Sequence, residues 1–322
     1  MNDKVVHWLE DDLEHVLKFT LRQLEYFIAA GETGSITLAS ERANISQPSI
    51  STAISHLEQE LGVQLFVRHH AQGLSLTPAG RTVLREAKEL IKQAEGLYSA
   101  TLETGQLRGT LSVGCLVTLA PMVMPELSWS FMKAHPGIDI RQSERHQEGL
   151  LEGLRRAEID IAVTYDLQIN SDIDFTPLVP LPPYALFGAS DPFHRRESVT
   201  LEELAQRPMI LLDLPISREY FLALFMKERL EPKVGWRSPN QEVVRTMVAN
   251  GYGYALFNAR PKANVALDGR RLYRVPLTGE HPPCVIGLAT LRQLSKSRVI
   301  EAFEQHCRGL ILEGQIPGME AP

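Results

Sequence analysis

One short run of residues decides the fold of this chain: Ser46-Gln47-Pro48-Ser49-Ile50-Ser51. Ser46 is a good helix N-cap, and Pro48 costs little in a first turn whose N–H groups lack partners within the helix. Apolar residues then recur at helical spacing and predict one buried face: Ile50, Ile54, Leu57 and Leu61. Gly62 follows as the expected C-terminal stop. We therefore predict an amphipathic helix over about residues 46–61.

The opposite face of this helix is polar and uncharged. It carries Pro48, Ser51, Thr52, Ser55 and Gln59. Neutral hydrogen-bonding groups at the start of a helix suit contact with base edges in DNA. Gln47 can pair with adenine, and the Thr52 methyl group can meet a thymine methyl. The pattern therefore indicates a helix that reads DNA.

The flanking segments complete a DNA-binding motif. Upstream, Ser35 can cap a short helix over residues 36–43, and an amphipathic helix beginning at Leu21 ends near Gly31. Only Asn44 and Ile45 separate the second helix from the third, which is typical of a helix-turn-helix, here over about residues 36–55. Downstream, residues 63–68 and 74–77 read as two strands around a turn, which predicts a hairpin or wing.

Residues 21–80 resemble the winged helix-turn-helix of LysR-type transcriptional regulators. Six blocks carry the resemblance, in the family's order and spacing: Leu21-Arg22-Gln23-Leu24-Glu25-Tyr26-Phe27, Gly34-Ser35-Ile36-Thr37, Ser46-Gln47-Pro48-Ser49, Ile54-Ser55-His56-Leu57-Glu58, Leu61-Gly62-Val63-Gln64-Leu65-Phe66 and Leu76-Thr77-Pro78-Ala79-Gly80. The resemblance implies double-stranded DNA as the partner. The expected contacts are Ser35, Thr37, Ser46, Gln47, Pro48, Ser49, Ser51, Thr52, Ser55 and, on the wing at the minor groove, Arg68. His69 and His70 are either phosphate neighbours or exposed turn residues.

The DNA-binding segment is poor in positive charge. Residues 21–80 hold three arginines and five glutamates, a net charge of −2. Phosphate contacts normally dominate affinity for duplex DNA. The chain also departs from the family at Thr52, where LysR-type recognition helices usually carry an arginine. We expect one copy of this domain to bind weakly and binding to depend on oligomerisation.

Thr77 and Pro78 begin a long helix, expected over residues 78–105, with apolar residues close to a 3.5-residue repeat. Its apolar seam is either the core of its own domain or a dimerisation surface, and the resemblance implies the second. The expected dimerisation residues are Leu84, Ala87, Ile91, Ala94 and Tyr98. A homodimer or homotetramer is the expected assembly.

Beyond a short hinge at residues 104–109, strands and helices alternate as in an α/β sheet. Strands are predicted over 111–116, 138–141, 159–165, 184–188, 209–212, 234–237, 253–257 and 285–291, and helices over 121–133, 148–157, 217–229, 240–250 and 296–310, with one more capped by Thr200. The region from 109 to 313 resembles the LysR effector-binding domain, which is similar to periplasmic solute-binding proteins. The resemblance implies subdomain I (about 109–180 and 281–313), subdomain II (about 181–280) and a ligand between them. The expected fold class is therefore α+β and multidomain.

Ligands in such folds bind beyond strand ends and at helix N-termini. That rule selects the candidate effector-binding residues Thr118, Tyr165, Ser217, Arg218, Asn240 and Gln241. Each has a structural alternative, since Thr118, Ser217 and Asn240 can simply cap helices and Tyr165 can pack against a subdomain wall. Arg218 could meet a carboxylate, so an anionic effector is one option.

Composition narrows the function classes. The 322 residues are 44% hydrophobic with a net charge of −6, which allows two or more cores. Cys115, Cys284 and Cys307 suggest neither disulfides nor zinc, and Cys115 is either an apolar core residue or a redox sensor. No long apolar run or signal-like N-terminus is visible, so we expect a cytoplasmic protein with no membrane partner.

The expected function is a ligand-responsive DNA-binding regulator with no cofactor and no metal, and RNA polymerase is a possible partner. A small-molecule binding protein acting without DNA regulation is the alternative. An enzyme is a third option, although the chain has no glycine-rich phosphate loop, HExxH or GxSxG in a strand-to-helix context.

The two ends of the chain are expected to differ. Residues 1–20 are expected to form an acidic amphipathic extension that docks on the DNA-binding domain, joins a dimer interface or stays a tail. Residues 314–322 are expected to be disordered.

Overall fold

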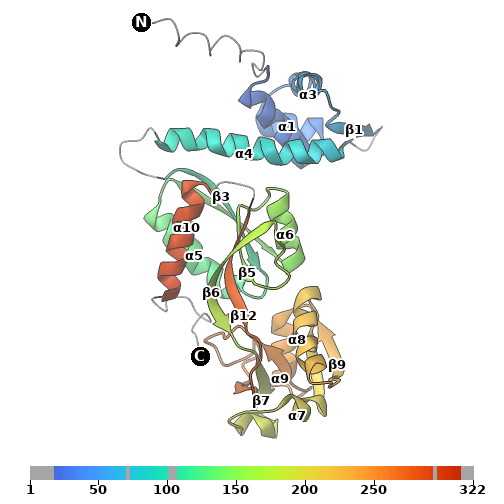
Figure 1. Ribbon diagram of the computed structural model, residues 1–322, viewed down its shortest axis with the longest axis vertical. Coiled ribbons are helices and arrows are strands. Elements are labelled where there is room, and N and C mark those ends of the chain that lie inside the picture. The colour runs from blue at the N-terminus through green and yellow to red at the C-terminus, as the bar shows by residue number, and fades with distance from the viewer. Residues whose placement is uncertain (1–17, 70–72, 101–106, 293–295, 313–322) are drawn as a thin grey trace, which may run out of the picture. The chain divides into compact units, whose positions relative to one another are not determined.

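The computed structural model describes residues 18–69, 73–100, 107–292 and 296–312, with the side chains of 95–100 and 312 left out. Our expectations for the N-terminal extension, His70, the hinge at 104–106 and the C-terminal tail lie outside these residues. The chain divides into two compact units, residues 1–101 and 102–322. Figure 1 labels the elements, and each unit is described by itself.

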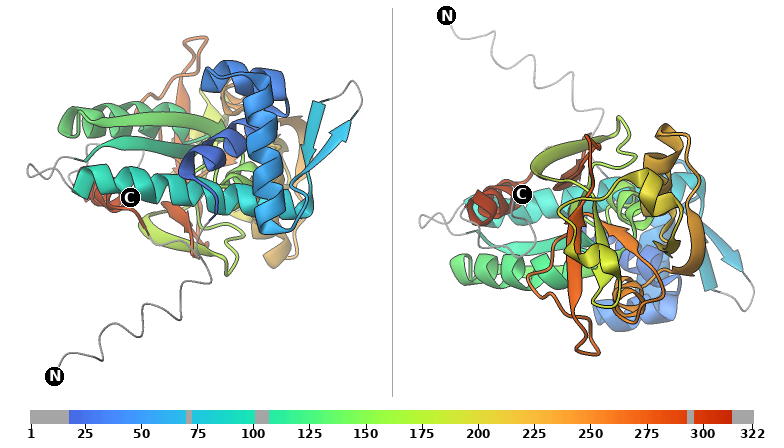
Figure 2. Two further views of the ribbon diagram at one scale, coloured as in Figure 1. Left: turned by 90° about the horizontal axis from the view of Figure 1, so that it is seen from above. Right: turned by 90° about the horizontal axis from the view of Figure 1, so that it is seen from below.

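The first unit contains the predicted winged helix-turn-helix. Its elements are α1 (Leu21–Thr33), α2 (Ile36–Ala43), α3 (Gln47–Leu61), β1 (Phe66–His69), β2 (Gly73–Leu76) and α4 (Pro78–Ala100). Local signals set the helix ends: the side chains of Thr20, Ser35 and Ser46 accept hydrogen bonds from the first turns of α1, α2 and α3. Gly62 ends α3 in the left-handed conformation, with φ of 65°. Figure 2 (left) shows the β1–β2 hairpin beside α3.

The core of this unit is assembled from all four helices and the hairpin. Phe27 of α1 is fully buried and meets Phe66 of β1 edge to face, with ring centroids 5.4 Å apart. Ile50, Ile54 and Leu57 of α3 lie in the same cluster, as predicted from the helical spacing. Glu58 fixes the start of the wing, because its Oε1 accepts hydrogen bonds from the backbone N–H of Leu65 and Phe66.

The second unit has two lobes. Lobe I is built on a five-stranded sheet in the order β4-β3-β5-β12-β6. Its elements are β3 (Gly109–Leu116), α5 (Ala120–Ala134), β4 (Ile138–Arg145), α6 (Gln147–Arg155), β5 (Ile161–Tyr165), β6 (Ile173–Leu181), β12 (Cys284–Leu291) and α10 (Arg298–Leu312). Figure 1 shows α5 and α10 on one face of the sheet and α6 on the other. β3 runs parallel to β4 and β5, whereas β12 is antiparallel to β5 and β6.

Lobe II contains a three-stranded sheet, β10-β7-β11, and the parallel pair β8–β9. Its elements are β7 (Tyr184–Gly188), the 3₁₀ turn η2 (Pro192–Arg195), α7 (Leu201–Ala205), β8 (Pro208–Leu212), α8 (Pro215–Lys227), β9 (Lys233–Ser238), α9 (Gln241–Ala249), β10 (Ala255–Phe257) and β11 (Leu272–Pro276). Thr200 caps α7 as predicted, and it forms a capping box with Glu203. The chain crosses between the lobes twice, from β6 to β7 and from β11 to β12.

Two strands of this unit were not predicted from the sequence. β6 contains Pro177 and Pro180, and proline is normally a signal against a strand because it cannot donate to the ladder. β6 tolerates both prolines because it is an edge strand, paired on one side only, with β12. β11 is likewise the edge strand of its sheet.

Candidate functional site

The polar face of α3 is open to solvent where DNA contact was predicted. Ser46, Gln47, Pro48, Ser49, Thr52 and Ser55 are exposed, and Ser51 is half-buried. Two serines also cap helices, because Ser46 Oγ accepts from the Ser49 N–H at 3.4 Å and Ser35 Oγ accepts from the Leu38 N–H at 3.4 Å. Thr37 on α2 is exposed. The surface is therefore neutral and rich in hydroxyl groups.

Two of the cations in this unit, Arg42 and Lys88, are paired with the carboxylate of Glu32. Arg42 on α2 lies 2.5 Å from Glu32, and the same carboxylate lies 2.9 Å from Lys88 of α4. Burial raises the pKa of the Glu32 carboxyl, but its bonds to Lys88 and Arg42 outweigh this and leave the pKa below its usual value. Arg68 on β1 is exposed on the wing, and its side chain has no hydrogen bond or ion pair among the described residues. Arg68 is thus better placed than Arg42 to meet a phosphate or the minor groove.

Part of the apolar face of α4 that was predicted to form a dimer is buried in the core of the first unit itself. Ala87 is only 2% exposed and lies in the cluster with Phe27 and Ile54, so its assignment as a dimer contact is wrong. The reason is that α4 packs against α1, which the helical repeat alone could not indicate. Leu84 and Ile91 pack partly against the same core, and Ala94 is half-buried. The side chain of Tyr98 lies outside the described residues.

A pocket lies between the two lobes of the second unit, at the ends of their strands. Four of the six predicted effector-binding residues line it: Thr118, Tyr165, Ser217 and Gln241. Thr118 follows β3, Tyr165 ends β5, Ser217 lies in the first turn of α8, and Gln241 begins α9. Neither α5 nor α8 has a side-chain cap at its N-terminus, so their free N–H groups can serve a ligand.

The other two predicted residues do not line this pocket. Arg218 turns to Asp213, with Nη1 and Oδ1 2.6 Å apart. Asn240 caps α9, since its Oδ1 accepts from the N–H groups of Glu242 and Val243. The structural alternative therefore holds for Asn240. For Arg218, an acidic neighbour five residues earlier in the sequence was a signal that pointed to this ion pair.

The rest of the lining was not predicted from the sequence. These residues are mainly apolar, aromatic or amide-bearing: Leu167, Leu212, Tyr220, Phe221, Phe257, Asn258, Ala259 and Cys284 complete the lining. Most lie inside helices and strands, where sequence gives no sign of which face meets the pocket. The cavity volume is only about 20 Å³, enough for a single water molecule. No lysine, arginine or histidine is among the described lining residues.

A wider groove lies on the outer side of α9, with a volume of about 390 Å³. It is more open than the pocket between the lobes, and all its described lining residues belong to lobe II, among them Asn240, Val243, Thr246 and Tyr252. Both lobes line the small pocket, and both also line a cavity of about 10 Å³ beside it, which shares Ser217 and includes Gln147 of lobe I. A ligand between the lobes can therefore be coupled to their arrangement, whereas a ligand in the outer groove contacts lobe II alone. We therefore take the pocket between the lobes as the candidate effector site.

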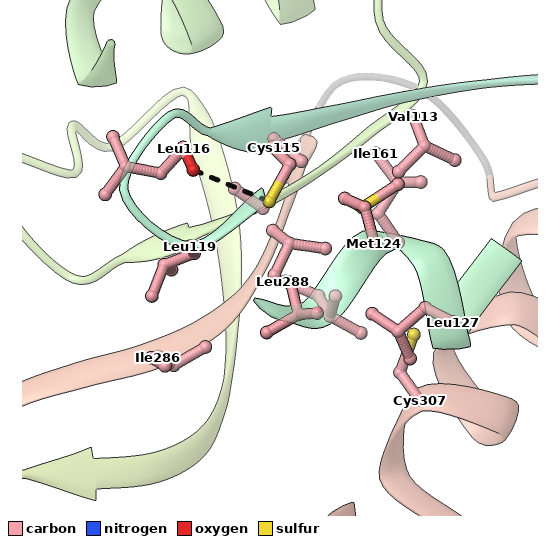
Figure 3. Packing of buried hydrophobic residues seen from close by; sticks show 14 of the residues in the cluster. Val113, Cys115, Leu116, Leu119, Met124, Leu127, Ile161, Ile286, Leu288 and Cys307 are labelled. Atoms are coloured by element: carbon pink, nitrogen blue, oxygen red, sulfur yellow. Dashed lines mark hydrogen bonds between the residues drawn. The ribbon is translucent and has the colours of Figure 1, made fainter. Parts of the chain in front are cut away.

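The cysteines contribute packing. Figure 3 shows Cys115 among apolar side chains of lobe I. Its Sγ donates to the carbonyl oxygen of Leu116 at 3.7 Å. Cys115 is 1% exposed, and burial raises the pKa of its thiol well above the usual value. Cys284 lines the pocket, and burial raises its pKa to about 12. Such thiols are protonated at neutral pH and therefore poor nucleophiles, so Cys115 fits the interpretation as a core residue.

A winged helix-turn-helix joined to a two-lobed α/β domain with a pocket between its lobes defines a class: one-chain regulators that bind DNA and a small ligand. Comparison with known proteins gives the family. Residues 21–81 match the bacterial regulatory helix-turn-helix domain of the lysR family, and residues 104–311 match the LysR substrate binding domain. The chain belongs to the LysR family of transcriptional regulators, as the sequence resemblance indicated.

Similar proteins agree with this assignment. The LysR family regulator HinK of Pseudomonas aeruginosa has a crystal structure that matches 90% of this chain and 98% of its own, at 36% identity and a TM-score of 0.61. A full-length variant of OxyR, also of Pseudomonas aeruginosa, matches 90% of this chain and 98% of its own, at 25% identity and a TM-score of 0.70. The HTH-type transcriptional regulator YybE of Bacillus subtilis is 28% identical over 88% of this chain and 96% of its own length. These relatives are regulators, and this chain is a regulator and not an enzyme.

Two further findings concern the described residues alone. Within them no helix is both long and apolar enough to cross a membrane. The same residues contain no group of three or more histidine, cysteine or acidic side chains that could hold a metal ion.

Proposed function

We propose that a small molecule held between Thr118, Tyr165, Ser217 and Gln241 changes how paired winged helix-turn-helix domains are arranged on promoter DNA. The observation that carries this proposal is that both lobes line one pocket, and all four residues lie at helix N-termini or strand ends. A ligand that binds one lobe arrangement better than another shifts the population toward it. A homodimer or homotetramer would pass that shift to the DNA.

The proposal assigns roles in DNA binding. Exposed Gln47, Thr52 and Ser55 of α3 meet base edges, and Arg68 on the wing meets the minor groove. The outer part of α4, including exposed Leu90, is the proposed dimer surface. Action on chromosomal DNA places the protein in the cytoplasm, with RNA polymerase as a further partner.

The Thr118 hydroxyl gives a direct test of the pocket. A thermal-shift screen of a metabolite library on the full chain identifies a ligand. The Thr118→Val variant keeps the side-chain shape but removes the hydroxyl, so ligand affinity should fall by about 5- to 10-fold, as for one lost hydrogen bond. Its DNA affinity without ligand should be unchanged. Isothermal titration calorimetry measures the first quantity, and fluorescence anisotropy measures the second.

Thr246→Val is the matched control, because Thr246 lines the outer groove of α9 instead of the pocket. We expect this variant to bind the ligand as the wild type does. A loss of affinity in Thr246→Val with none in Thr118→Val would place the ligand in the outer groove and contradict the proposal.

A further inference from the structure

The two segments that cross between the lobes share an unusual composition. The first is Leu181-Pro182-Pro183-Tyr184 and the second is His281-Pro282-Pro283-Cys284. Proline fixes its own φ and restricts the residue before it, so a proline pair forms a stiff, extended link. Stiff crossings transmit a rotation of one lobe to the other instead of absorbing it locally.

Two side chains connect these crossings by hydrogen bonds. Asn258, which is 4% exposed, uses its Nδ2 to donate to the Leu181 carbonyl oxygen at 2.9 Å and to the Tyr220 hydroxyl at 3.1 Å. The Tyr220 hydroxyl in turn donates to the Pro282 carbonyl oxygen at 2.7 Å. Asn258 thereby uses both hydrogens of its amide group. The chain of bonds runs from one crossing to the other, and we call it the Tyr220–Asn258 crossbar.

Tyr220 is also a wall of the pocket. It lies in α8 of lobe II, and its ring packs against the apolar cores of both lobes. Asn258 and Cys284 line the same pocket beside it. Burial raises the pKa of the Tyr220 phenol well above its usual value, so the hydroxyl stays protonated and keeps its role as a donor.

Tyr220 is one of the side chains that keep the pocket small. The present volume of about 20 Å³ admits about one water molecule, far less than an aromatic ring requires. Removing the Tyr220 ring would open a ring-shaped space edged by the Asn258 amide and the Pro282 carbonyl. Both groups would lose a hydrogen-bond partner, which favours a ligand that supplies a hydroxyl in the same place.

We infer that the effector is an uncharged aromatic compound carrying a hydroxyl group, which displaces Tyr220 and opens the crossbar between the two diproline crossings. No basic side chain is among the described lining residues and Arg218 is held by Asp213, so a carboxylate in this pocket would depend on the uncapped N-termini of α5 and α8 alone. The inference rests on the proposed function for its regulatory meaning. The crossbar itself is testable without effector or DNA.

Hydrogen exchange measures the crossbar in the full chain. Tyr220→Phe removes only the hydroxyl, and amide exchange in peptides covering residues 178–186 and 278–288 should accelerate by about 10-fold, the effect of roughly one net hydrogen bond. Tyr252→Phe is the matched control, because Tyr252 is exposed in the outer groove, and it should leave these peptides unchanged. Equal exchange in Tyr220→Phe and the wild type would overturn the crossbar.

A ring-shaped probe measures the space that Tyr220 fills. p-Cresol, which reproduces the tyrosine side chain, should raise the melting temperature of Tyr220→Ala by at least about 2 °C, and toluene should raise it less. In the wild type p-cresol must first displace Tyr220, so it should stabilise the wild type less than Tyr220→Ala, and Tyr252→Ala should respond as the wild type does. Equal responses of Tyr220→Ala and the wild type to p-cresol would overturn the inference. A ligand that binds but leaves promoter binding unchanged would instead contradict the proposed function and leave these results standing.

Discussion

Replacing Thr52 with arginine is expected to raise the affinity of the full chain for its DNA site by about 10-fold at moderate salt. Thr52 is exposed on α3, in a unit where Arg42 is already paired with Glu32. An added guanidinium can contact a phosphate or a guanine. If it contacts a phosphate, the slope of log affinity against log salt steepens by about one unit. Fluorescence anisotropy across a salt series, on a site selected by the wild type from random DNA, measures both quantities.

Thr52→Glu is the opposite-charge control. It should weaken binding to the selected site by about 10-fold, so that the two variants differ by roughly 100-fold. Both should melt like the wild type, because Thr52 is exposed and Ala53 and Ile54 carry the buried face. If neither variant changes the affinity, α3 does not face DNA at this position.

Replacing Gly80 with alanine is expected to abolish DNA binding by unfolding the first unit. A Cβ at Gly80 would lie 2.0 Å from the carbonyl oxygen of Leu65, which itself accepts from the Thr77 N–H. The first turn of α4, which contains Gly80, packs against the backbone of Leu65 just before β1, and this contact leaves no space for a side chain. The clash should destabilise the first unit by more than about 3 kcal/mol. Calorimetry of the full chain should show an early transition for this unit and an unchanged transition for the second.

Gly309→Ala is the matched control for this substitution. Gly309 lies within α10, and an added Cβ would meet nothing within 4 Å. Alanine there should stabilise the second unit by about 0.5–1 kcal/mol, the usual helix-propensity difference. A Gly80→Ala protein that binds DNA as tightly as the wild type would show that the hairpin can move away from α4 at little cost.

Local signals in the sequence were sufficient for the DNA-binding unit. Ser46, Pro48 and Gly62 mark the ends of α3, and the apolar spacing between them defines its buried face. The spacing of apolar residues could not indicate which element covers each helix face. Ala87 was therefore assigned to a dimer interface, although it is buried within the first unit. An amphipathic stripe records that a face is covered but does not identify what covers it.

The pocket was only partly predictable for a similar reason. Thr118, Ser217 and Gln241 lie where strands end and helices begin, and the general rule for α/β folds selects such positions. Tyr220 lies within α8 and Asn258 directly follows β10, and they reach the pocket through the way the two lobes meet. Nothing in the sequence indicates that Asn258 bonds to Leu181 while Tyr220 bonds to Pro282. That arrangement belongs to the tertiary structure.

We propose that a ligand in the pocket between the lobes rearranges the DNA-bound winged helix-turn-helix domains. Hydroxyl-radical footprinting of the full chain on its selected site, at fixed salt with and without the ligand found by thermal shift, measures this rearrangement. We predict that the ligand changes the protected region, with a boundary moving by about one helical turn of roughly 10 base pairs. If a ligand saturates the pocket while DNA affinity and footprint both stay the same, the pocket does not control the arrangement of the DNA-binding domains.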